Sequence, residues 1–299
     1  MRKDTTKKFL MREDKYLDQM LSKDVVAFII KNKINVDARQ IRYDEIEFRN
    51  VFSTTTFTYL NKTNLLGLKY NMIYCKGDKS HSGFLLGETE VTQELYELVM
   101  GYNPSGFQGK YPTNSGFQGK YPTNQRPVEN VTWYDAIMFC NKLSALTNKR
   151  PYYEITIEAY EDKTQTNIEK ASVKINKGAN GFRLPSEQEW EYAAKADTNN
   201  LYAGTNDIDK LEEYAWFLKN SNNETHPVAM KKPNEWGFCD MSGTVEEWCY
   251  DLYDKTSIHC VSRGCGWSHD ASYLHSANRF KSSPSTRNIY VGFRVSASL

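Results

Sequence analysis

The sequence lacks an excess of charge of either sign. Its 299 residues include 38 Lys and Arg against 37 Asp and Glu, which gives a formal net charge of +1. A chain without a basic field has no general attraction for the phosphates of DNA or RNA. The charge balance therefore argues against nucleic acid as a partner.

Long apolar runs are also missing. The mean hydropathy is -0.67, and no apolar run approaches the roughly 20 residues that cross a bilayer. The basic first residues, MRKDTTKKFLMRED, are not followed by the apolar core of a signal peptide. The sequence therefore predicts no transmembrane segment. It leaves open a cytoplasmic protein or one whose export signal or lipid anchor precedes the given residues.

Cysteine is sparse for a chain of this length. Six cysteines are far fewer than a disulfide scaffold contains, and they form no CxxC pair and no cluster with His at zinc-ligand spacing. We expect them to be buried free thiols, and we expect no metal site and no cofactor. The cysteines leave the redox compartment open. They are Cys75, Cys140, Cys239, Cys249, Cys260 and Cys265.

Four segments have the apolar spacing of amphipathic helices. They are residues 15–31 and the stretches that follow Thr92, Thr132 and Ser186. Thr132 with Asp135, and Ser186 with Glu189, have the spacing of a capping box. The glutamates at 187, 189 and 191 are explained by this cap and by the helix dipole rather than by acid–base catalysis.

Shorter alternating runs predict strands, and the overall pattern predicts an α+β fold. The runs are residues 70–76, 84–86, 152–157 and 171–175, of which the last two would form a hairpin. Residues 34–58 are left undivided between strand and loop. We expect an N-terminal extension, partly helical, over residues 1–65 and one domain over residues 66–299, with irregular loops in its Trp- and Gly-rich last third.

One decapeptide occurs twice in tandem. The sequence SGFQGKYPTN fills residues 105–114 and again 115–124. A unit of ten residues is shorter than the repeats that stack into solenoids, and loop closure tolerates added length. We therefore expect a duplicated surface loop. The alternative is that its phenylalanines and tyrosines are exposed binding aromatics.

A series of motifs follows in register over about residues 68 to 299. They are EVTQELYELVMGYNP (90–104), RPVENVTWYDA (126–136), RLPSEQEWEYA (183–193), NEWG (234–237), DMSG (240–243), EW (247–248), RG (263–264) and GFR (292–294). Together they resemble the formylglycine-generating enzyme, or sulfatase-modifying factor, family. The resemblance implies an irregular, loop-rich variant of the C-type lectin fold.

The departures from that family concern its chemistry. Its enzymes carry copper-binding, redox-active cysteines after the RGGSW-type motif, but this chain has Leu274 at the matching position and no cysteine after Cys265. The resemblance thus implies a protein that is not an enzyme. The alternative is a metal-dependent oxidase with a relocated site, in which Cys265 would be a displaced nucleophile. Thr244 and Glu246 depart from the family's GNVWEW motif and put its calcium site in doubt.

The segment 263–295 contains a loop with the composition of a binding surface, in which adaptable polar groups accompany a few aromatics. An enzyme-type domain with such a loop resembles the variable proteins of diversity-generating retroelements, those of treponemes in particular. The resemblance implies a display protein at the cell surface that binds a protein or glycan ligand. The alternative is a solvated loop with no binding role, or a structural envelope protein.

Fourteen side chains of this segment are the candidate ligand-binding residues. His269 and His275 belong to them as contact residues rather than as metal ligands, because six residues in a loop separate them. A framework of Ala271, Leu274, Ala277, Arg279, Pro284 and Arg287 is expected to hold the loop. The candidates are Ser268, His269, Asp270, Ser272, Tyr273, His275, Phe280, Lys281, Ser282, Ser283, Ser285, Asn288, Ile289 and Tyr290.

Overall fold

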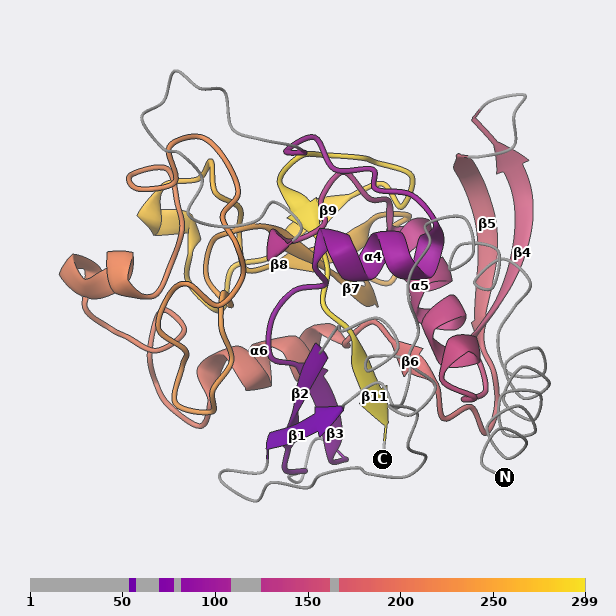
Figure 1. Cartoon of the computed structure of the whole chain (residues 1–299), viewed down its shortest axis with the longest axis horizontal. Coiled ribbons are helices and arrows are strands. Elements are labelled where there is room, and N and C mark those ends of the chain that lie inside the picture. The colour runs from indigo at the N-terminus through magenta and orange to yellow at the C-terminus, as the bar shows by residue number, and fades with distance from the viewer. Residues whose placement is uncertain (1–53, 58–69, 78–81, 109–124, 162–166, 299) are drawn as a thin grey trace, which may run out of the picture.

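The computed structural model describes residues 54–57, 70–77, 82–108, 125–161 and 167–298. Helices lie between runs of strands along this part of the chain, and the strands build three sheets (Figure 1). The helix predicted over residues 15–31 lies outside the described residues. Of the residues that the structure describes, no helix is long and apolar enough to cross a membrane.

The largest sheet is antiparallel and has the order β1-β2-β3-β11-β6. Its strands are β1 (Thr54–Phe57), β2 (Tyr70–Cys75), β3 (Phe84–Gly87), β6 (Phe182–Arg183) and β11 (Ser296–Ser298). The end of the chain thus lies between β3 and β6. β1 precedes the boundary expected at residue 66, so the stretch that the sequence left undivided contributes a strand to the sheet of the domain.

A second sheet carries the segment expected to bind a ligand. It has the order β10-β7-β8-β9 and consists of β7 (Glu246–Leu252), β8 (Cys260–Arg263), β9 (Phe280–Ser282) and β10 (Val291–Gly292). β10 is parallel to β7, and the other pairs are antiparallel. The segment 263–295 therefore leaves β8, forms one edge strand as β9 and returns as the opposite edge, β10.

The predicted capping boxes begin two of the helices. α5 (Trp133–Leu146) starts after Thr132, whose hydroxyl accepts from the Asp135 N–H, and α6 (Glu187–Lys195) starts after Ser186 in the same way. α4 (Gln93–Met100) has Thr92 as its N-cap and Gly101 in the left-handed conformation at its end. Two short 3-10 helices, η3 (Ile208–Glu213) and η4 (Ala271–Tyr273), lie in the irregular regions.

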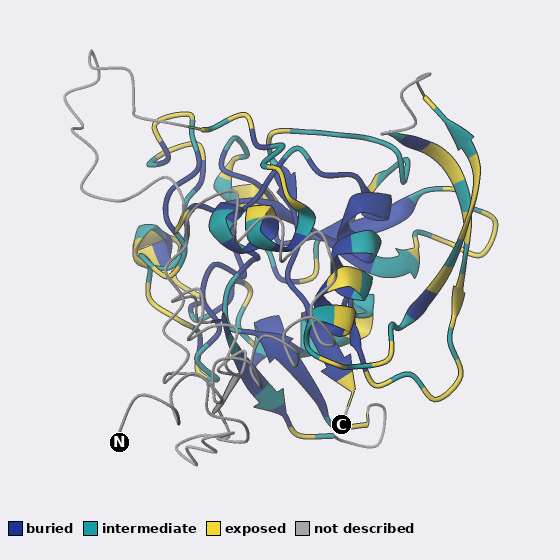
Figure 2. Ribbon diagram, turned by 45° about the vertical axis from the view of Figure 1, so that its right-hand side comes forward, coloured by how far each residue is buried: buried dark blue, intermediate teal, exposed yellow. Residues whose placement is uncertain are grey.

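The predicted hairpin is present as β4 (Tyr153–Tyr160) and β5 (Ile168–Ile175), and it stands at the edge of the molecule (Figure 1). The interior lies under the sheets and the helices α5 and α6 (Figure 2). It contains Trp190 and Trp248, both fully buried. All six cysteines are buried and free, as expected, so packing and not covalent bonds closes the loops.

Candidate ligand-binding face

None of the fourteen candidate residues is buried. Asp270, Ser272, Tyr273, Lys281 and Ile289 are exposed, and the other nine are half-buried. The expected framework behaves less uniformly. Leu274 is buried in a small core with Cys265 and others, but Ala277 is exposed, which corrects its assignment as a framework residue. Buried and exposed side chains therefore lie close to one another along the segment.

Four candidate rings meet in one aromatic cluster, which consists of His269, Tyr273, Phe280 and Tyr290. The His269 ring centroid lies 5.8 Å from Tyr273, 5.6 Å from Phe280 and 5.8 Å from Tyr290, with the last ring edge-on. Tyr273 lies 6.4 Å from Phe280. Asn288 donates from Nδ2 to the Tyr290 hydroxyl at 2.6 Å. The fold thus brings together side chains from η4, β9 and the loop before β10.

A carboxylate lies beneath the aromatic cluster. Glu246 begins β7 and is 4% exposed. Its Oε2 accepts from the Ser262 hydroxyl at 2.6 Å, and its Oε1 lies 3.8 Å from His269 Nε2. Burial raises the Glu246 pKa to about 7, although the Ser262 hydrogen bond lowers it. Burial lowers the pKa of His269. The sequence identifies Glu246 only as a departure from a calcium motif and does not predict its position beneath this face.

The beginning of the duplicated decapeptide borders the same face. Phe107 packs edge-on against Trp267, with ring centroids 5.4 Å apart, and Trp267 Nε1 donates to the Ile289 carbonyl. The Phe107 N–H donates to Glu129 Oε1 at 2.9 Å. Ser105 is buried. These residues are part of the packed structure, whereas residues 109–124 lie outside the described part of the chain.

Other candidates lie away from the aromatic cluster. Lys281 alternates with Phe280 along β9 and so points to the other face, where its Nζ lies 5.0 Å from the centre of the Tyr253 ring. His275 packs edge-on against Tyr202. Ser283 and Ser285 flank Pro284, which lines a pocket of about 690 Å³ together with residues of β5, β7 and the loop after β7. The fourteen residues therefore form several neighbouring patches.

Ion pairs of one buried arginine anchor the segment at its start. Arg263, 1% exposed, donates to Glu187 at 2.8 Å, to Glu191 at 2.8 Å and to the Ser276 carbonyl at 2.6 Å. Glu187 also accepts from Arg279 at 2.5 Å. This corrects the prediction that all three glutamates of α6 serve its cap and dipole. Only Glu189 closes the capping box, and the other two clamp arginines that are more than 70 residues away.

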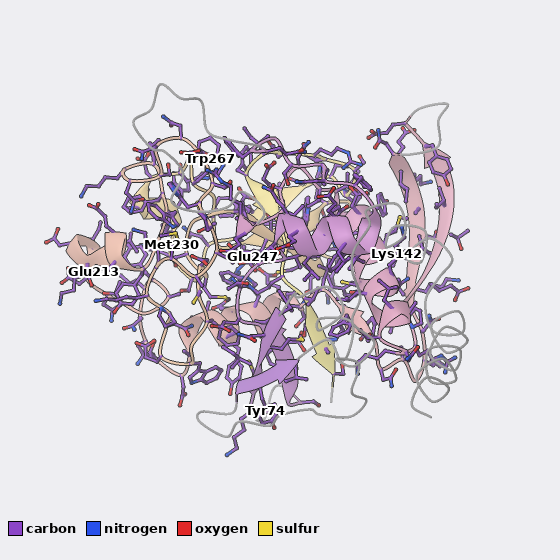
Figure 3. All side chains as sticks on the ribbon, viewed as in Figure 1. Tyr74, Lys142, Glu213, Met230, Glu247 and Trp267 are labelled. Atoms are coloured by element: carbon purple, nitrogen blue, oxygen red, sulfur yellow. The ribbon has the colours of Figure 1, made fainter. Side chains whose placement is uncertain are left out.

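A second buried clamp anchors the end of the segment. Arg294 donates to both oxygens of Glu247, at 2.6 and 2.7 Å, and neither side chain is exposed. The remaining N–H groups reach the carbonyls of Gly87, Glu88 and Cys239. Trp190 Nε1 donates to Glu247 as well. Figure 3 labels Glu247 near the centre of the view and Trp267 at its upper left.

The residues at the family's chemical positions do not fit its metals. Cys265 is fully buried, and burial strongly raises the pKa of its thiol, which disfavours the thiolate that binds copper. Leu274 is buried beside it in the same small core. At the calcium motif, the Thr244 hydroxyl is buried without a hydrogen-bond partner, and Glu246 faces Ser262 and His269. Within the described residues, no three His, Cys, Asp or Glu side chains gather as a metal site.

Comparison with known families identifies the domain. Residues 69–299 match the model of the sulfatase-modifying factor enzyme 1-like domain. The chain belongs to this family. Its fold is the C-type lectin-like variant of that family, as predicted, since a solved relative has the same architecture: the variable protein 1 of Treponema denticola is 32% identical, with a TM-score of 0.66 over 82% of this chain and 98% of that one.

Two curated relatives illustrate the range of the sulfatase-modifying factor family. The chaperone protein LppX of Paenibacillus barcinonensis is 39% identical over 212 residues, which are 62% of this chain and 70% of that protein. The inactive C-alpha-formylglycine-generating enzyme 2 of Mus musculus is 31% identical over 134 residues, 40% of this chain and 44% of that protein. The predicted resemblance to the family and to a treponemal variable protein is thus confirmed.

Proposed function

We propose that this protein is a ligand-binding display protein whose C-terminal face recognises a macromolecular ligand, a protein or a glycan, and that it has no catalytic activity. One observation carries the proposal. None of the candidate contact residues is buried, while the residues that anchor the same segment, Arg263, Leu274 and Arg294, are buried. Contacts can then change without disturbing the fold.

The comparisons support this function. The solved relative from Treponema denticola is named a variable protein, and the mouse relative is named an inactive enzyme. The buried, high-pKa thiol of Cys265 and the presence of Leu274 at the family's cysteine position also favour an inactive domain. We propose display at the cell surface, through a signal or lipid anchor that precedes the given residues, with neither nucleic acid nor a cofactor as a partner.

The coding DNA provides the decisive test. If the segment is diversified by a retroelement, the codons for residues 263–295 have a near-identical copy nearby, close to a reverse transcriptase gene. The two copies should differ almost only where the template has adenine, and these differences should fall at the candidate positions. The prediction is firm for twelve of the fourteen and weaker for Lys281 and Asn288. Leu274, Arg279, Pro284 and residues 292–294 should match. The absence of such a copy would refute the diversification.

Substitution of the face tests the binding role directly. Tyr273→Ala, Phe280→Ala and Tyr290→Ala should each weaken binding to a ligand identified on a protein or glycan array by about 2 kcal/mol. Tyr273→Ala should unfold at nearly the wild-type denaturant concentration, because that side chain is 50% exposed. Phe280→Ala and Tyr290→Ala, at half-buried positions, should cost more stability but keep cooperative unfolding. If they unfold the protein instead of weakening binding, the segment is scaffold and the proposed function is wrong.

A further inference from the structure

We propose that the face contains a subsite for an ammonium group of the ligand, over the solvent-facing side of the aromatic cluster, where the buried Glu246 carboxylate attracts it from below. This inference rests on the proposed function, because the ammonium group belongs to the ligand that the face binds. It adds the chemical class of one ligand group and a residue, Glu246, that lies outside the segment 263–295.

The rings supply the first half of such a subsite. Four ring contacts join the cluster of His269, Tyr273, Phe280 and Tyr290, with ring centroids 5.6 to 6.4 Å apart. The faces of such rings carry partial negative charge and attract cations within about 6 Å of the ring centre. The Tyr273 side chain is 50% exposed. The cluster is therefore reachable from solvent on at least one side.

The carboxylate supplies the second half. Glu246 Oε2 is engaged by Ser262, but Oε1 lies 3.8 Å from His269 Nε2, which is longer than a hydrogen bond. The Gly266 N–H can only donate, and it points at His269 Nδ1 at 3.4 Å, so Nε2 carries the ring proton of the neutral imidazole. Neutral His269 leaves the Glu246 charge without a cationic partner.

The basic side chains of the segment are turned elsewhere. Lys281 lies over Tyr253, and Arg279 pairs with Glu187 and covers the same Tyr253 ring at 4.6 Å. Arg287 pairs with Asp135 at 2.7 Å. The cations of the face thus do not fill the place beside Glu246. An anionic ligand group would be repelled there, while an ammonium group would contact the rings and be attracted by the carboxylate beneath them.

The experiment uses the full chain and two ammonium probes, at about pH 8 so that Glu246 is ionised. Choline and Nα-acetyl-lysine methylamide represent a glycan- or lipid-borne and a protein-borne ammonium group. Each is compared with its neutral isostere, dimethylbutanol or the norleucine derivative. We expect the ammonium probes to shift the NMR ring signals of Tyr273 and Tyr290 and to bind at least tenfold more tightly than their isosteres. The ammonium probe that binds more tightly indicates whether the ligand's ammonium group belongs to a glycan or lipid or to a protein.

Variants locate the effect. Glu246→Gln keeps the size and an oxygen for Ser262, and it should weaken ammonium binding at least tenfold. Tyr273→Leu, at an exposed position, should weaken it several-fold and serves if the first variant folds poorly. Asp209→Asn, an exposed carboxylate on η3, is the matched control and should change nothing.

Equal binding of charged and neutral probes, or unchanged binding after Glu246→Gln or Tyr273→Leu, would overturn the subsite. Neither result bears on the retroelement copy or on ligand loss in the alanine variants, which test the proposed function separately.

Discussion

The arginines that anchor the segment 263–295 and the candidate contact residues of the same segment differ in how firmly they are held. Arg294 is fully buried and uses its guanidinium on both Glu247 oxygens and on backbone carbonyls. Tyr273 is half exposed and meets only neighbouring rings. A fold can change its contact residues freely only if its anchors are fixed by bonds that do not involve those residues.

The largest effect should come from removal of an anchor. Arg294→Met leaves the Glu247 carboxylate buried without its cation, and breaking a buried pair in this way costs about 3 to 5 kcal/mol. We expect urea unfolding to shift by that amount.

The matched control for this variant is Arg279→Met. Arg279 is 39% exposed on its ion pair with Glu187, so its loss should cost less than about 1 kcal/mol. Equal losses from the two arginines would show that burial does not decide how much each ion pair stabilises the segment.

The next effect concerns the acid beneath the face. The Glu246 pKa is about 7 in the folded protein and near its ordinary value of 4.5 when unfolded. Between these values the folded state holds a proton that the unfolded chain has released, so the free energy of unfolding falls as pH rises. A shift of this size corresponds to ~3 kcal/mol at full ionisation.

Glu246→Gln should remove this part of the pH dependence. Asp240 and Glu90 also have raised pKa values, but they remain in the variant and cancel in the comparison. The difference in unfolding free energy, variant minus wild type, should therefore rise by ~3 kcal/mol from about pH 4.5 to about pH 8. A difference that does not change with pH would mean that Glu246 ionises normally.

Local features could be predicted from the sequence and long-range partners could not. The caps at Thr132 and Ser186 involve residues three apart, so their spacing is visible in the chain. The partners of Arg263 are 72 and 76 residues away on α6, and no periodicity connects them. The position of Glu246 beneath His269 likewise depends on how β7 packs against the loop after β8.

The exposure of the candidate residues could also be predicted from the sequence, for a different reason. A polar, aperiodic segment between motifs has no face to bury, and the resemblance to variable proteins indicated its use. The framework positions were harder to predict, because the same loop buries Leu274 and exposes Ala277. Small apolar residues in irregular backbone give no pattern from which burial can be read.

The smallest effect should come from the duplicated decapeptide. Deletion of residues 115–124 leaves SGFQ in place at 105–108, because the two copies are identical. Ser105 stays buried and Phe107 keeps its contact with Trp267. If the duplicated stretch is a surface loop, as the sequence predicts, removal of one of its two copies halves its length. Such a change alters the free energy of loop closure by only about 0.6 kcal/mol, in favour of the shorter loop. We therefore expect the free energy of unfolding to change by less than about 1 kcal/mol.

A second variant separates the packed start of the decapeptide from its duplication. Phe107→Ala in the full-length chain removes the ring that packs on Trp267, and it should cost more than the deletion, about 1 to 2 kcal/mol, because contact area at the border of the face is lost. Urea unfolding of both variants gives the comparison. If the deletion abolishes cooperative unfolding while Phe107→Ala is tolerated, the second copy belongs to the core, and the duplication is structural rather than an added length of surface loop.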